Sequence, residues 1–332
     1  MGCASSTGRF DDVEPRASSP PRGETSPSPS GKGGGRRRSL DTVWHDALDT
    51  FREGFAKPRW ECARDTVGTW LRVRGRTYLT DGGVKVGSER ALCECKHVDF
   101  FDFSGGEEGG AAELERRLDV ARRRGESWMT RERERLAAMG RSMPWTFVFH
   151  FVNPDGASIV CYFQPNDDEG DDGEDGEANA VSSTAEELCR RHHHQKGFSN
   201  DESSILRKFL LDGDDAYRSA RMKLAVKLFK GPAVLRRVLP SRPVLVGQRA
   251  TTRFYRGEGG PLENKYLEVD LICASNATAK YLYSAFSSYS ARSEQELAFW
   301  IEGTSESELP ERLLGAVRLR RVSKEILTKL PP

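Results

Sequence analysis

The sequence lacks a long apolar run: no stretch of 18 consecutive apolar residues occurs in it, so we expect no membrane-spanning helix. Positions 1–40 also contain no apolar core of the kind found in secretory leaders. Both absences predict a protein in the cytosol or on a membrane surface that faces it. The seven cysteines, an odd number in a chain without a leader, are therefore interpreted as reduced thiols rather than a disulfide framework.

An excess of one charge sign is also missing. The chain has 51 basic and 50 acidic residues, whereas dedicated nucleic-acid binders usually carry a strong basic excess, so we expect no nucleic-acid partner. The sequence contains no Gly-x-Ser-x-Gly elbow, no Walker-type phosphate loop and no dinucleotide fingerprint. These absences argue against common hydrolase and nucleotide-binding classes. We predict no catalytic residues, no cofactor and no metal site.

What the sequence does contain begins at its N-terminus, Met1-Gly2-Cys3-Ala4-Ser5-Ser6. Gly2 followed by Ser6 is the pattern of N-myristoylation, because the amine of Gly2 becomes the acylated nitrogen and a side chain there would obstruct the acylating enzyme. One myristoyl chain binds membranes only marginally, so stable attachment needs a second signal. A palmitoyl thioester on Cys3 would supply it. We therefore predict lipidation at Gly2 and Cys3.

Electrostatic attraction is a further membrane signal in the same tail. Residues 1–40 are rich in Pro, Ser, Gly and Arg, with few large apolar side chains, which predicts disorder. The basic residues expected to face an anionic leaflet, each worth about 1 kcal/mol, are Lys32, Arg36, Arg37 and Arg38. Ser39 follows the arginines and suits a basic-directed kinase, whose phosphate would weaken this attraction. A solvated basic linker is the alternative.

The rest of the chain is rich in strand-like segments. Extended runs are expected over 70–74, 77–79, 91–103, 145–152, 158–163, 222–229, 233–239, 244–255, 266–273, 296–301 and 316–322. Helices are expected over about 41–55, within 111–139, over 203–211 and over 277–289. Positions 167–177 carry eight acidic residues and no basic one, so residues 166–200 are predicted to be a disordered, solvated insertion. Many strands with a few separate helices predict an α+β fold.

Short motifs spread over residues 60–322 give the chain a family likeness. The most telling are Tyr266-Leu267-Glu268-Val269-Asp270 and Glu308-Leu309-Pro310-Glu311; others begin at Trp70, Val98, Trp145, Ala220, Lys230, Arg242 and Ser275. In this order they resemble the C-terminal domain of the plant Enhanced Disease Resistance 2 proteins, where it follows pleckstrin-homology and START lipid-transfer domains. Neither of those domains is recognisable here. The chain is accordingly divided into a tail, 1–40, and an Enhanced Disease Resistance 2 C-terminal-like domain, 41–332.

The resemblance implies membrane-associated, lipid-linked regulation and no catalytic chemistry. It implies a curved, mainly antiparallel sheet, and it allows a lipid-accommodating cavity under that sheet. We therefore expect a non-catalytic lipid-binding or signalling module, anchored at the cytoplasmic face of the plasma membrane or an endomembrane. Membrane lipids of an anionic leaflet are the expected partner, with a protein partner or a kinase as further ones. Two alternatives stay open: an adaptor tethered only by its acyl tail, and an unrecognised enzyme such as a hydrolase.

Arginines in the predicted strands are candidates for contact with anionic lipid headgroups. Arg72 and Arg74 alternate on one strand face, and Arg236 and Arg237 lie in another strand. If these side chains converge, they would form a basic patch able to bind headgroup phosphates. Scattered, solvated arginines are the alternative.

Other polar groups are interpreted as structural. Glu268 and Asp270 share one strand face, where a polar outer face or an ion pair with an arginine is preferred to acid–base catalysis. His150 stands among apolar neighbours and is expected to be a hydrogen-bonded structural histidine. Cys93 and Cys95 alternate along a strand and are expected to be small core residues rather than metal ligands.

Overall fold

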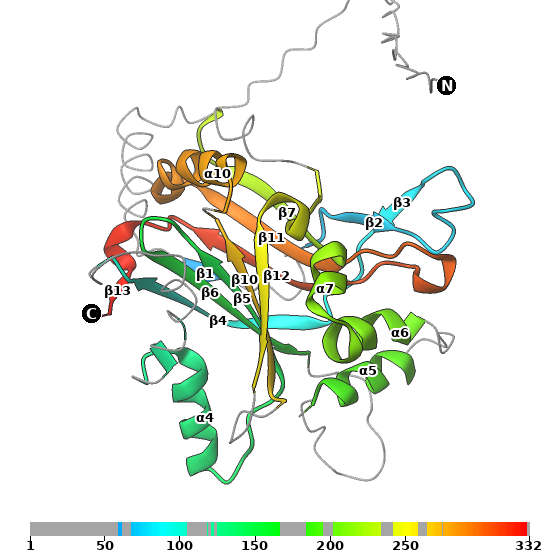
Figure 1. Cartoon of the computed structure of the whole chain (residues 1–332), viewed down its shortest axis with the longest axis horizontal. Coiled ribbons are helices and arrows are strands. Elements are labelled where there is room, and N and C mark those ends of the chain that lie inside the picture. Colours follow the sequence, from blue (N-terminus) through cyan, green and yellow to red (C-terminus); the bar gives the residue numbers. More distant parts are fainter. Residues whose placement is uncertain are drawn as a thin grey trace, which may run out of the picture. The chain divides into compact units, whose positions relative to one another are not determined.

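The structure, a computed structural model (Figure 1), describes residues 59–61, 68–104, 118, 121–122, 125–166, 184–194, 202–233, 242–257, 264–273 and 275–330. All of them fall within one compact unit, residues 57–332. Several predictions lie outside the described residues: Gly2, Cys3, Lys32, Arg36, Arg37, Arg38, Ser39, Arg236, Arg237, the helix at 41–55 and all but the first residue of the strand at 233–239.

Two main β-sheets form the unit, and most of their ladders are antiparallel. The five-stranded sheet has the order β1 (Arg59–Glu61), β12 (Leu313–Arg320), β11 (Glu294–Ile301), β7 (Met222–Lys230) and β8 (Val244–Leu245). The six-stranded sheet has the order β13 (Thr328–Lys329), β4 (Cys93–Asp102), β6 (Ala157–Pro165), β5 (Thr146–Val152), β10 (Tyr266–Ile272) and β9 (Thr251–Arg256). A short hairpin joins β2 (Arg72–Arg74) to β3 (Lys85–Gly87). The parallel ladders are β10–β5 and β13–β4.

The helices are short and separate, so the α+β prediction is confirmed, with two curved sheets in place of one. They are α4 (Trp128–Ala138), α5 (Ala185–His194), α6 (Glu202–Arg207), α7 (Asp215–Arg221), α9 (Val246–Arg249) and α10 (Ala277–Ser287). A π-helical turn (Lys208–Asp212) and 3-10 turns (Ser290–Arg292, Glu306–Glu308 and Lys324–Ile326) complete the described helical elements. None of the described helices combines the length and apolar character that crossing a membrane requires.

The inner faces of the two sheets meet in the main core. Phe149 on β5 lies 4.4 Å, centroid to centroid, from Phe299 on β11, and Phe163 on β6 lies 5.7 Å from the same ring. These side chains are fully buried. Phe149 and Phe163 come from the predicted strand pair, in which every second residue points inward. Aromatic pairs of this kind add to the burial of apolar area that holds the sheets together.

The outer faces of the sheets are covered separately. Met129 and Leu136 of α4 pack with Val148 and Val160 of the six-stranded sheet. Because Leu118, Ala121 and α4 lie on this face, polar side chains there are buried instead of solvated. On the five-stranded sheet, Val73 of the hairpin joins a smaller apolar cluster that includes Trp300.

Cys93 and Cys95 lie in the main core, as expected. The register of β4 against β6 shifts between Cys95 and His97. Because of this bulge, the inward-facing residues are Cys93 and Cys95 before the shift and Val98 after it. Burial raises the pKa of the Cys93 thiol, so it stays protonated.

The prediction of one continuous strand over 244–255 is wrong. The segment is β8, the single turn α9 and then β9. Gly247 explains the break: a Cβ there would lie 2.4 Å from the carbonyl oxygen of Ser219, so only glycine lets α9 approach α7 this closely. The expected strand at 77–79 is likewise a turn leading into β3.

The predicted disordered insertion at 166–200 requires a correction at its C-terminal end. Residues Ala185–His194 form α5, and Ala185, Leu188 and Cys189 are buried in the main core. These positions have the i, i+3, i+4 spacing of a helix face. Their apolar signal is hidden in the sequence between an acidic run and a histidine run, so composition alone pointed to a solvated loop. The acidic run itself lies outside the described residues.

Candidate functional site

An apolar cavity of about 170 Å³ lies between the two sheets and is bounded by α9 and α10. Its walls come from inward positions of strands in both sheets and from the two helices. The lining residues are Phe151, Asn153, Ile159, Leu224, Val226, Val244, Val246, Arg249, Ala250, Leu271, Cys273, Ala279, Tyr283, Phe286, Gln295, Leu297 and Leu319. An apolar space of this kind, with few polar groups, is the usual form of a small-molecule site.

Helix α10, orange at the top of Figure 1, is held over the cavity by polar contacts at several points. Its N-cap Asn276 accepts a hydrogen bond from the Ala279 amide at 2.8 Å and donates through Nδ2 to the Arg249 carbonyl at 2.7 Å. Further along, the Tyr283 hydroxyl donates to Asp155 at 2.6 Å. These contacts fix α10 to α9 and to the β5–β6 turn, so the helix covers the cavity without its side chains filling it.

Gln295 is the buried polar side chain that stands out in the lining. It is only 2% exposed, and its Oε1 atom has no hydrogen-bond partner. Its position on β11 causes this, because Gln295 alternates with the core residues Leu297 and Phe299 and so points inward. A buried acceptor left unpaired costs about 1–3 kcal/mol. The largely apolar wall of the cavity therefore includes one unsatisfied acceptor, Gln295 Oε1.

Two other lining residues define the chemistry of the cavity. Arg249 lines the cavity and is exposed, so the cavity reaches the protein surface beside α9. Cys273 follows β10, and burial raises the pKa of its thiol to about 12. A thiol with that pKa is protonated at neutral pH and is a poor nucleophile. The cavity is thus suited to binding rather than to covalent chemistry through Cys273.

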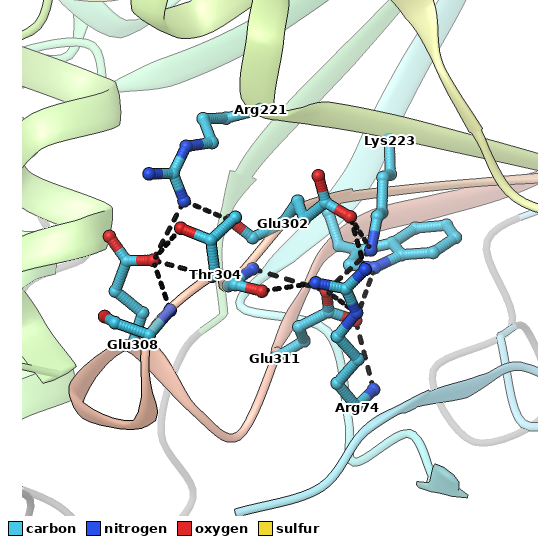
Figure 2. Close-up of polar contacts among 10 residues, drawn as sticks. Arg74, Arg221, Lys223, Glu302, Thr304, Glu308 and Glu311 are labelled. Carbon is cyan, nitrogen blue, oxygen red and sulfur yellow. Dashed lines mark hydrogen bonds and ion pairs between the residues drawn. The ribbon is translucent and has the colours of Figure 1, made fainter. Parts of the chain in front are cut away.

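The predicted headgroup arginines are brought together only in part. Arg72 is exposed and donates to the backbone carbonyl of Lys85. Arg74 lies on the same face of the hairpin, but its guanidinium binds Glu302 at 2.6 Å and the Gly303 carbonyl at 2.6 Å (Figure 2). The charge of Arg74 is therefore balanced inside the protein, and Arg72 keeps the exposed position. A basic patch formed with Arg236 and Arg237 stays a prediction.

The motifs that begin at Trp70, Ala220 and Glu308 meet at one buried carboxylate, that of Glu311 (Figure 2). Its oxygens accept hydrogen bonds from Lys223 Nζ at 2.7 Å, from Trp300 Nε1 at 3.1 Å and from the backbone amides of Arg74 and Gly303 at 3.1 and 3.3 Å. Glu311 is 4% exposed. Because four donors surround the carboxylate, neither oxygen is available as a general base. We assign this Glu311 cluster a structural role.

A second buried polar group lies on the outer face of the six-stranded sheet. Glu268 forms an ion pair with Arg122, and Asp270 lies 2.9 Å from His150 Nδ1. The expectations of an arginine ion pair and a hydrogen-bonded histidine are confirmed, although both carboxylates are buried rather than solvated. Burial raises the pKa of Glu268 to about 7, although Arg122 opposes the rise.

The same residues form a metal-capable set among the described residues: His150, Glu268 and Asp270 have ligand atoms within 4.8 Å of one another. Their donors are nitrogen and oxygen, which suit several divalent cations. The guanidinium of Arg122 already binds Glu268 and places a positive charge beside the set. A cation would have to displace that charge, so the donor set fits an ion-pair network better than a metal centre.

Sequence reasoning missed Gln295 and the contacts that hold α10. The signal for Gln295 was present, since a polar residue at an inward position of an apolar alternation indicates a special role. The Asp155–Tyr283 contact joins positions 128 residues apart. No local pattern could have predicted it.

Comparisons with known proteins give the family. The family model described as Protein ENHANCED DISEASE RESISTANCE 2, C-terminal, matches residues 64–323, more than half of the chain. The chain is also 33% identical over 119 residues, 36% of its length, to Protein ENHANCED DISEASE RESISTANCE 2-like of Arabidopsis thaliana. That match spans 16% of the length of the Arabidopsis protein. No solved structure matches the chain. The chain therefore belongs to the family of the C-terminal domain of Protein ENHANCED DISEASE RESISTANCE 2.

Proposed function

We propose that this protein is a non-catalytic lipid-binding module, attached to the cytoplasmic face of a membrane by acyl groups on Gly2 and Cys3. The observation that carries the proposal is the apolar cavity with Gln295 in its wall. Membership of the family supports a regulatory or lipid-binding role. The proposed ligand enters between the sheets with an apolar segment and meets the unpaired acceptor of Gln295.

The size of the cavity limits how much of a ligand it can hold. An engineered apolar cavity of about 150 Å³ stays dry and binds benzene, and the volume here is about 170 Å³. The cavity therefore accommodates a short part of an acyl chain or one ring, not a whole membrane lipid. The exposed side chain of Arg249 marks where the remainder of a longer ligand would leave the protein.

The polar group in the wall limits the ligand chemically. Gln295 Oε1 is an acceptor without a partner, so a ligand that brings a hydroxyl or another donor would relieve the cost of burying it. A ligand without a donor would leave that cost in place. We infer that alcohols or protonated acids with a short apolar chain are preferred to hydrocarbons of equal size.

The environment of the buried acidic groups supports a binding role in preference to catalysis. Donors surround both oxygens of Glu311, and Glu268 is engaged by Arg122. Neither carboxylate lines the apolar cavity. Acid–base catalysis by either carboxylate would need that group within hydrogen-bond reach of a ligand in the cavity.

Calorimetric titration of the full-length protein with 1-octanol tests the proposal. Ala279 lines the cavity on α10 and is 9% exposed, so Ala279→Phe should fill it and abolish binding. Ala277 is exposed on the same helix, so Ala277→Phe is the matched control and should bind like the parent protein. Binding should show a negative heat-capacity change, the signature of apolar burial. Equal binding by the Ala279→Phe variant, or no binding by the parent protein, would rule out the cavity as the site.

A further inference from the structure

Exposed apolar side chains concentrate on the β2–β3 hairpin. Among the described residues, five large apolar side chains are exposed, and three of them are Leu79, Val84 and Val86, at 46%, 54% and 44%. Single exposed apolar residues are normal, whereas a contiguous group marks an interaction surface. This feature lies on a different element from the ligand cavity and does not depend on it.

The hairpin is fixed at its base and extends beyond the sheets at its tip, as the cyan ribbon of Figure 1 shows. Val73 is 2% exposed and packs in the cluster that contains Trp300, which anchors β2 to the five-stranded sheet. Arg74 pairs with Lys85 across the hairpin. Because side chains alternate along each strand, Val84 and Val86 lie on the face opposite Lys85.

The turn at the tip has defined internal hydrogen bonds. Asp81 accepts from the Thr77 hydroxyl at 2.7 Å and from the Val84 amide at 3.0 Å. These hydrogen bonds, the Thr77 hydroxyl first, lower the pKa of Asp81. Gly82 and Gly83 supply the positive φ values that the turn requires. The carboxylate at the tip is thus directed into the turn, and Leu79 and Val84 are presented by a preformed loop.

The charges around the apolar group are mainly basic. Residues 72–90 contain five basic and two acidic residues. One acidic residue is Asp81, bound within the turn, and the other is Glu89, which pairs with Arg312 at 3.0 Å. Arg76 is exposed in the turn, and Arg72 is exposed on the face of the strand pair that also carries Lys85, opposite Val86. A basic surface with an apolar centre is complementary to an anionic lipid headgroup layer over hydrocarbon.

We propose that the hairpin docks onto an anionic membrane. Leu79, Val84 and Val86 enter the interfacial region of the leaflet, while Arg72 and Lys85 remain at the level of the phosphates. Long basic side chains do this by extending along an apolar surface and keeping their charge in water. The hairpin would orient the domain on the membrane, whereas the acyl groups would only tether it.

Vesicle flotation of the full-length protein tests this inference. The reference protein carries Gly2→Ala, Cys3→Ser, Lys32→Ala, Arg36→Ala, Arg37→Ala and Arg38→Ala, which remove the predicted signals of the tail. It should float with vesicles of phosphatidylcholine containing 30% phosphatidylserine, and less with phosphatidylcholine alone. Adding Leu79→Ser, Val84→Ser and Val86→Ser should reduce partitioning roughly tenfold or more. Adding Met139→Ser instead, at a 50% exposed position elsewhere, should change nothing.

Hydrogen–deuterium exchange on the reference protein gives a local readout that needs no hairpin variant. With anionic vesicles, the amides of residues 76–87 should exchange more slowly, while those of exposed turns elsewhere keep their rates. The inference is overturned if the triple serine variant floats like the reference, or if vesicles leave exchange in the hairpin unchanged. It is also overturned if the reference protein floats with vesicles of neither composition. A protein partner would then be the occupant of this surface.

Discussion

Lys223 and Glu311 form a buried ion pair with 2.7 Å between Nζ and Oε1, joining β7 to the segment that precedes β12. Arg74 Nε lies 3.7 Å from the same carboxylate oxygen (Figure 2). The pair therefore ties the five-stranded sheet to the base of the β2–β3 hairpin. Lys223 Nζ also lies 3.0 Å from Glu302, but removing one member of a buried pair generally costs more than the pair contributes.

Glu311→Gln is predicted to destabilise the protein by about 3 kcal/mol or more. Both oxygens of the carboxylate accept hydrogen bonds, so the NH2 group of the amide would face donors in either orientation. Urea unfolding at neutral pH measures the change. Glu306→Gln, an exposed position in the same loop, should stay within about 0.5 kcal/mol of the parent protein. If the Glu311→Gln protein is as stable as the Glu306→Gln control, the structural role assigned to the Glu311 cluster is wrong.

Stability is predicted to depend on pH through Glu268. Burial raises its pKa from 4.5 to about 7 in the folded protein, so the folded state holds a proton that the unfolded state has lost. The contribution is fully present below about pH 4.5 and is lost as the pH rises through about 7. Melting temperatures of the parent and of Glu268→Gln should therefore diverge over this range, with the parent losing stability relative to the variant. Parallel pH profiles would contradict the prediction.

Gln295→Leu is predicted to separate stability from ligand preference. Replacing an unpaired buried acceptor by an apolar side chain of similar size should leave the unfolding free energy unchanged or raise it by about 1 kcal/mol. The variant should also lose the preference for 1-octanol over a hydrocarbon of similar length. Gln248→Leu, an exposed position on α9, is the control for both measurements. A clear loss of stability in Gln295→Leu would show that Oε1 has a partner.

The tail is predicted to provide a reversible attachment. Gly2→Ala should abolish incorporation of labelled myristate and move part of the protein from the membrane fraction of cells to the soluble fraction. Lys32 and the arginines at 36, 37 and 38 contribute about 1 kcal/mol each near an anionic leaflet, so replacing the three arginines by alanine should weaken partitioning about 100-fold. Ser39→Asp should weaken it in the same direction. Unchanged partitioning of the Ser39→Asp protein would refute the phosphorylation hypothesis.

Strands with strong aromatic alternation could be predicted from the sequence, and so could their turn. The segment that became β5 and β6 shows both, because Phe147, Phe149 and Phe163 mark one face and Gly156 allows the hairpin. The long strand β4 was also expected. Local patterns suffice in such cases because one buried face imposes a period of two on the chain.

Features that depend on distant contacts could not be predicted in the same way. Helix α9 forms where Gly247 packs closely against Ser219. Helix α5 packs an apolar face whose pattern is obscured in the sequence by the polar residues on either side. The cavity depends on both sheets, on α9 and on the position of α10. The family resemblance allowed a cavity, but its lining and its single unpaired acceptor became visible only in three dimensions.

The central claim is that the apolar cavity binds a small apolar ligand with Gln295 at its polar contact. NMR of the full-length protein, labelled at the glutamine side-chain amides and the leucine methyls, tests this most directly. Titration with 1-octanol should shift the signals of Gln295, Leu224 and Leu297, which line the cavity, and Ala279→Phe should abolish those shifts. Shifts confined to residues outside the cavity, or unaffected by Ala279→Phe, would contradict the claim.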